Sequence, residues 1–185
     1  MDEAQAEREA IARDQQSVIA EEDSSEGVIG IIIERDSPTV MGRVVRMNLS
    51  GRIVMRSAMD TVHTRTVTFA GERIIAIAGQ NAGNGAVRLV EINPANLEMA
   101  RQGDDDLLAG SLLWVNGSDL YAITFDIENS HCYLGRFNTN LALQAKSSVR
   151  INPNASVSIQ QGRLLTQRED GQALILNPAN LTEVR

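Results

Sequence analysis

The sequence predicts an all-β, propeller-like fold of about four four-stranded blades, preceded by a short helical arm. Three observations lead to this prediction. Two landmarks recur along the chain at spacings of 39 to 46 residues. Each period contains short apolar stretches separated by turns rich in Gly, Asn and Pro. No segment after residue 27 has the long 3.6-residue periodicity of a helical solenoid. Four-stranded units at this period are typical of propeller blades.

Both landmarks are short apolar patterns. The first is an apolar residue followed by Asn at the end of an alternating stretch: Met47-Asn48, Ile92-Asn93, Phe137-Asn138 and Leu176-Asn177. The second is a mostly apolar triplet that begins at Val28, Ile74, Leu120 and Leu164. Because the two landmarks agree on one period, they indicate a repeat architecture.

Each unit contains several short segments whose sequences are typical of β-strands. The second unit has them at 66–70, 73–78, 86–92 and 97–101, and the third at 112–115, 119–125, 132–137 and 141–146. The fourth has them at 156–159, 163–167, 173–176 and from Leu181 onward. The first has 28–33, 43–47 and 52–56, with no clear opening strand.

The repetition has a physical reason, because a sheet that is apolar on both faces needs a neighbour on each side. The missing strand of the first unit leaves two alternatives. Residues 17–20 supply that strand, or the ring is open at one seam. An open seam would favour dimerisation through its edge strands.

Residues 1–26 carry the whole net charge of −7, since they hold nine acids and two bases. The remaining residues hold 15 acids and 15 bases. Residues 4–22 favour helix, and Ala4, Ile11 and Val18 recur at intervals of seven. We therefore interpret 1–26 as a helical arm and linker at the end of a coiled-coil region, and 27–185 as the propeller-like domain. The arm is a second route to homo-oligomerisation.

Composition excludes several classes of protein. The neutral body and an aromatic content of 3% argue against nucleic acid as a partner. A single cysteine rules out an internal disulfide and any multi-cysteine zinc site. No apolar run approaches the length of a membrane span. The acidic N-terminus lacks a signal-peptide pattern, so we expect a mature form or a fragment if the protein is exported.

Two resemblances follow from particular stretches of sequence. The run Gly85-Ala86-Val87-Arg88-Leu89 through Ile92-Asn93-Pro94 resembles the repeats of quinoprotein-type propellers, but the recurring blade-end tryptophan of those enzymes is absent. The stretches 61–69 and 77–94, with the Asp104-Asp105-Asp106 run and the strand at 111–115, resemble the spirochaetal large coiled-coil antigen family, the eighty-three/one-hundred kilodalton antigen of Borrelia and Treponema. This resemblance covers 27–185. It implies an antigenic protein of the periplasm or cell envelope with no assigned enzymatic activity.

Three groups of residues were weighed as candidate chemistry. Asp104-Asp105-Asp106 offers hard oxygen ligands for calcium, but the run lacks the pattern of a calcium-binding loop, and a solvated inter-blade loop is the favoured explanation. His131-Cys132 places an imidazole beside a thiol, but strand geometry points the two side chains to opposite faces, so Cys132 is interpreted as a small buried residue. The lone His63 has no partner at zinc spacing.

We therefore expect a non-enzymatic interaction or structural module of the cell envelope that binds a protein or wall component. No catalytic, cofactor-binding or metal residue is assigned, and no cofactor is expected. The alternative is a propeller enzyme or small-ligand binder that uses the central channel.

Overall fold

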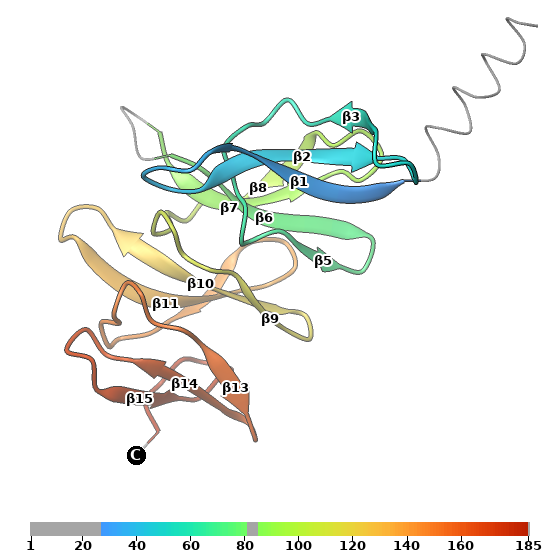
Figure 1. The fold of residues 1–185 in the computed structure, drawn as a ribbon. Coiled ribbons are helices and arrows are strands. Elements are labelled where there is room, and N and C mark those ends of the chain that lie inside the picture. The colour runs from blue at the N-terminus through green and yellow to red at the C-terminus, as the bar shows by residue number, and fades with distance from the viewer. Residues whose placement is uncertain (1–26, 81–84, 185) are drawn as a thin grey trace, which may run out of the picture.

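The computed structural model describes residues 27–80 and 85–184, and within these ranges it contains β-strands and no α-helix (Figure 1). The all-β prediction is confirmed.

The strands fall into four units in chain order. Unit one holds β1 (Val28–Arg35), β2 (Met41–Met47) and β3 (Ile53–Arg56). Unit two holds β5 (Thr68–Ala70), β6 (Arg73–Gly79), β7 (Val87–Ile92) and β8 (Met99–Gln102). Unit three holds β9 (Trp114–Asn116), β10 (Asp119–Asp126), β11 (His131–Phe137) and β12 (Leu143–Lys146), and unit four holds β13 (Ser158–Gln160), β14 (Arg163–Gln167) and β15 (Ala173–Leu176).

Each unit is an antiparallel meander whose strands pair in sequence order. The predicted boundaries of β14 and β15 are confirmed residue for residue, and most others are right to within two residues. One strand was not predicted: β4 (Val62–His63) pairs with both β2 and β6 and so joins units one and two into one sheet. β4 is missed because two residues are too few to show a period.

The fourth strand expected in unit four, from Leu181 onward, is not formed in the described residues. Unit one has no opening strand among the described residues, as its sequence suggests, and residues 17–20 lie outside the described ranges. In unit four the chain after Leu181 makes one isolated bridge, from Leu176 to Glu183, and a hydrogen bond from Val184 N to Ile175 O. This contact is too short to form a strand.

The landmarks of the sequence mark equivalent places in the structure. The residue that opens each apolar triplet pairs across the sheet with the residue before each repeated asparagine: Val28 with Met47, Ile74 with Ile92, Leu120 with Phe137, and Leu164 with Leu176. The repeat inferred from the sequence is therefore a repeat of strand register.

The repeated asparagines form the turn that follows. The side-chain oxygen of Asn93 accepts a hydrogen bond from Ala95 N at 2.8 Å, and Asn177 accepts from Ala179 N at 2.9 Å in the same way. Such Asx turns are typical of this residue. Each turn ends at a residue with positive φ, and in units two to four that residue is a buried leucine: Leu97, Leu141 and Leu181.

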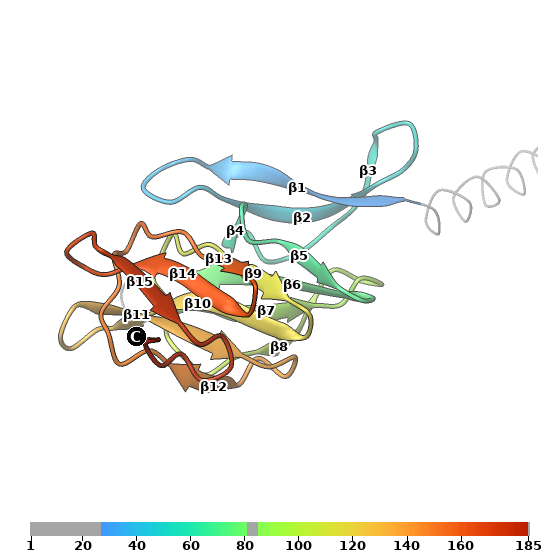
Figure 2. The same cartoon turned by 90° about the horizontal axis from the view of Figure 1, so that it is seen from below.

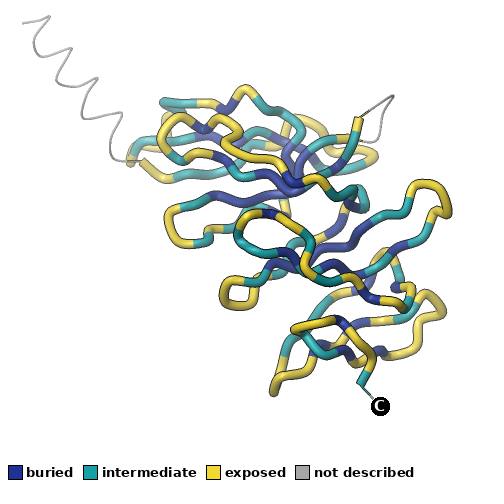
Figure 3. Tube along the Cα trace, turned by 180° about the vertical axis from the view of Figure 1, so that it is seen from behind, coloured by how far each residue is buried: buried dark blue, intermediate teal, exposed yellow. Residues whose placement is uncertain are grey.

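The core consists of three clusters that lie between consecutive units. Alternate residues of one strand serve two clusters: Ile74 and Ala76 of β6 face unit one, whereas Ile75 and Ile77 face unit three. In β10, Leu120 packs toward unit two. The cluster between units three and four contains Tyr121, Ile123, Leu134, Leu164 and Leu176. Figure 3 shows the buried positions concentrated in the strands and the exposed positions in the turns.

Four units with three interfaces make an open stack. Figure 1 shows the units in order from blue to red, and in Figure 2, seen from below, unit four is drawn over unit three. In the described part of the chain, no core cluster joins unit one to unit four. The predicted helical arm, 1–26, lies outside the described residues, and no described helix is long and apolar enough to cross a membrane.

Candidate functional site

Two adjoining pockets form a groove at one end of the units. One has a volume of about 260 Å³ and the other about 270 Å³. They share Pro38, Thr39 and Ala109. We call the combined space the 38–65 groove. Its remaining lining residues are Arg35, Ser37, Val40, Met41, His63, Thr64, Arg65, Thr66, Gln80, Gly110, Ser111 and Leu112.

Two walls of the groove are successive copies of one repeated segment. Val62 pairs with Gly42 and Ala78, which belong to neighbouring units. Leu107 does the same one unit later: its N–H donates to Val87 O at 2.8 Å, and it bridges to Thr124. Residues 63–66 and 108–111 follow these bridges and occupy corresponding places. The third wall is the β1–β2 loop.

A buried hydroxyl fixes each copy of this segment. Thr66 Oγ1 accepts a hydrogen bond from Ile77 N at 2.9 Å and donates to His63 O at 2.7 Å. Ser111 Oγ accepts from Ile123 N at 2.9 Å in the equivalent way. The walls are therefore held on the strands and do not depend on surface contacts alone.

His63 is buried where the corresponding residue of the next unit is Leu108. Its Nε2 lies 3.0 Å from Gly79 O, and because a carbonyl only accepts, Nε2 carries the proton. Nδ1 has no hydrogen-bond partner among the described residues. Burial lowers the pKa of His63, which keeps the ring neutral near neutral pH.

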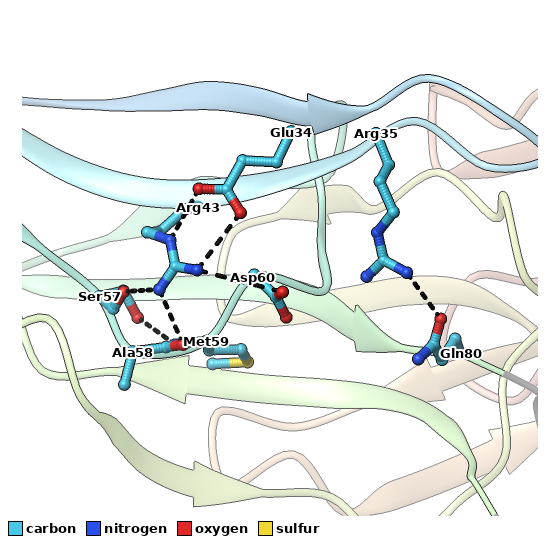
Figure 4. A network of polar contacts seen from close by, with 8 residues as sticks. All are labelled: Glu34, Arg35, Arg43, Ser57, Ala58, Met59, Asp60 and Gln80. Carbon is cyan, nitrogen blue, oxygen red and sulfur yellow. Dashed lines mark hydrogen bonds and ion pairs between the residues drawn. The ribbon is translucent and has the colours of Figure 1, made fainter.

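The groove is cationic within an acidic chain. Arg35 and Arg65 line its two parts, and neither an Asp nor a Glu is among its lining residues. Arg35 Nη1 donates to Gln80 Oε1 at 3.0 Å (Figure 4). The adjacent Glu34 turns instead to Arg43, whose Nε lies 2.8 Å from Glu34 Oε1, and this ion pair lowers the pKa of Glu34.

This lining holds groups that can bind a carboxylate. Arginine forks recognise carboxylates through paired N–H donors. Pro38, Met41, Ala109 and Leu112 add apolar surface beside them. Among the lining residues, no carboxylate or thiol stands beside His63 to form a nucleophile–base pair.

Of the three candidates from the sequence, His63 lines the groove, whereas Asp104-Asp105-Asp106 and His131-Cys132 are not among its lining residues. Asp106 Oδ1 is 3.3 Å from Arg88 Nη2, so that carboxylate is engaged by a cation. No group of three or more His, Cys, Asp or Glu side chains in the described residues is arranged to hold a metal ion. Cys132 is buried between units three and four as expected, and burial raises the pKa of its thiol.

Sequence reasoning missed the groove. The groove is lined by three segments that the fold brings together, and the sequence of each segment is typical of an ordinary turn. One signal was available: aligned on the repeat, His63 and Arg65 replace Leu108 and Gly110. Polar residues at apolar or small repeat positions indicate a local function.

The comparisons with known proteins identify the family. The family model described as Borrelia P83/100 protein matches residues 1–157. The chain belongs to the Borrelia P83/100 protein family. The resemblance inferred from the sequence is thus confirmed, and the match extends over the arm as well as most of the body. No curated protein matches the chain.

One solved structure shows the fold shared with this P83/100 family member. BamB from Moraxella catarrhalis, a propeller, matches with a TM-score of 0.52 and 15% identity over 84% of this chain and 50% of that chain. The computationally designed Ika8 protein matches with a TM-score of 0.49 and 9% identity over 87% of this chain and 49% of that one. The chain spans about half the length of these structures.

Proposed function

We propose that this P83/100 family member is a non-enzymatic interaction module of the bacterial cell envelope, in the periplasm or at the envelope itself, that binds a protein or wall component. The observation that carries the proposal is the 38–65 groove, with two arginines, several hydroxyls and no carboxylate. The propeller-like body presents the groove, and the arm, as the end of a coiled coil, acts as a spacer.

The partner presents a carboxylate next to small apolar groups. Arg65 is exposed, and among the described residues no carboxylate is paired with it. Arg35 is also exposed and donates to a neutral amide. Both guanidinium groups can therefore receive an external carboxylate without first breaking an ion pair. The apolar walls accept the flanking atoms.

Fluorescence anisotropy with two labelled pentapeptides tests this proposal. One peptide alternates Ala and Glu, and the other alternates Ala and Gln. We expect the Glu peptide alone to bind, and more weakly as salt rises, because exposed charges are screened. Arg65→Glu should weaken binding about tenfold or more, as expected for the loss of a charge-assisted hydrogen bond.

Arg163→Glu is the matched control, since Arg163 is an exposed arginine outside the groove. It should leave binding unchanged. Equal binding of the Glu and Gln peptides, or equal loss in the two arginine variants, would overturn the groove as the binding site. Hydrolytic or redox turnover by the purified protein would overturn the non-enzymatic assignment in favour of a channel enzyme.

A further inference from the structure

The two ends of the stack expose the two halves of one repeated interface. The opening position of the apolar triplet is buried in three units, at 0% exposure in Ile74, 1% in Leu120 and 0% in Leu164. The same position in unit one, Val28, is 60% exposed. Each buried residue packs against the preceding unit. Val28 is the member of this series whose preceding unit is missing from the described stack.

The next position in the repeat lies on the other half of the interface, the half that packs against the following unit. Ile75 and Tyr121 are both 0% exposed because each packs against the following unit. In unit four the same position is Leu165, which is 48% exposed. Its cross-strand partner Ile175 is 43% exposed. A terminal repeat that ends in water usually carries a polar outer face. Here two large apolar side chains remain at its centre.

The charges on the outer face of unit four also differ from those on the corresponding faces of units two and three. In units two and three an ion pair spans the strands near this position, Arg73 with Glu91 and Asp119 with Arg136. Glu91 and Arg136 occupy the same repeat position in units two and three. In unit four this position is Ile175. Unit four therefore has a more apolar outer surface at the place where the inner units hold a salt bridge.

We propose that a second copy of this chain covers both ends. Unit four of one copy packs on unit one of its partner, and the partner's unit four packs on unit one of the first copy. The exposed face of unit four continues a series of three interfaces that the chain already makes with its own repeats. The matching half of that interface is the outer face of unit one. Two such head-to-tail contacts leave neither end exposed.

The fold relationship agrees with the size of this assembly. The four units superpose on about half of the BamB chain, so two copies together supply about as much chain as that propeller holds. This contact joins sheet faces, and it differs from pairing at the free edge of β1 or association through residues 1–26. The inference is independent of what the 38–65 groove binds.

Sedimentation velocity of the full chain tests the proposal. The variants are Leu165→Glu and Val28→Arg, both at exposed positions, so each should still fold, which a cooperative thermal melting transition would show. The control is Ile127→Glu, a 58% exposed residue in the β10–β11 connection that lies on neither end face. We expect each end-face variant to halve the sedimenting mass and the control to leave it unchanged.

The double variant Val28→Arg with Leu165→Glu places opposite charges across each contact, because the equivalent inner residues Ile75 and Leu120 share one cluster. It should recover the wild-type mass at low salt. Three results would overturn the proposal: a monomeric wild type at its highest soluble concentration, unchanged mass in both end-face variants, or oligomers that keep growing with concentration.

Discussion

Ile92 and Leu176 occupy the same place in two different sheets. Each is fully buried, each pairs with the residue that opens the apolar triplet of the neighbouring strand, and each precedes an asparagine that forms the following turn. Because the equivalence extends to Leu120 and Phe137, the chain is a repeat in register and in burial as well as in sequence.

Adjacent leucines in β14 should differ sharply in their contribution to stability. Leu164 is fully buried between units three and four, whereas Leu165 faces outward. Leu164→Ala should lower the free energy of unfolding by about 2–5 kcal/mol, and Leu165→Ala by less than about 1 kcal/mol in dilute protein. Urea unfolding measures both. Leu120→Asp and Leu164→Asp should abolish folding, and a soluble variant with an unchanged melting temperature would contradict the shared core.

The hydroxyl of Thr66 should matter more than its size suggests. Thr66→Val keeps the shape but leaves Ile77 N–H buried without its acceptor. We expect a loss of about 1–3 kcal/mol in the free energy of unfolding. Thr68→Val, in the neighbouring strand β5, is the control and should be nearly neutral. An equal effect of the two substitutions would show that the hydroxyl does not hold the groove wall.

His63 should make stability sensitive to mild acid. Burial lowers its folded-state pKa below the ordinary 6.5, so the unfolded chain binds a proton first as the pH falls. Stability is therefore intact above about pH 6.5 and declines below it. His63→Leu, which copies Leu108, should flatten this decline in melting temperature between pH 7 and 5. A wild-type melting temperature that is constant over this range would refute the assignment.

The Arg73–Glu91 pair should be lost only at lower pH. Arg73 Nε lies 2.7 Å from Glu91 Oε1, and this hydrogen-bonded pair lowers the pKa of Glu91 from its ordinary 4.5. The contribution is complete above about pH 4.5 and is lost as the pH falls through the folded-state pKa. Glu91→Gln should cost about 1 kcal/mol at pH 7, and its unfolding curve should converge on that of wild type in acid.

The more exposed pair of Arg168 with Glu183 provides the comparison. Glu183→Gln should cost less than about 0.5 kcal/mol because solvent screens this pair. A larger cost for Glu183→Gln than for Glu91→Gln would contradict the role given to burial.

The repeat was predictable because it depends on local sequence patterns. Strand alternation and the Asn turns depend on neighbours within a few residues, so β14 and β15 were placed correctly from residues alone. β4 and the 38–65 groove were not predictable in the same way. Val62 acts through contacts with Gly42 and Ala78, and Arg35 and the segment at 63–66 line adjoining parts of one groove only after two units pack together.

The exposure of the outer faces of units one and four was the least predictable feature. Val28 and Leu165 are ordinary strand residues in the sequence, and their exposure follows from which units have neighbours. The sequence raised an open seam as one alternative, but it pointed to strand edges. The structure shows that sheet faces are exposed as well.

Nuclear Overhauser contacts between methyl groups test the repeated sheet-on-sheet packing most directly. The interfaces predict contacts from Leu120 to Ile77 and, one unit later, from Leu164 to Ile123, because each pair shares a core cluster. Observation of both contacts in the same protein is the predicted result. Methyl groups of Leu164 that contact only their own sheet, while Leu120 contacts Ile77, would contradict the equivalence of the units.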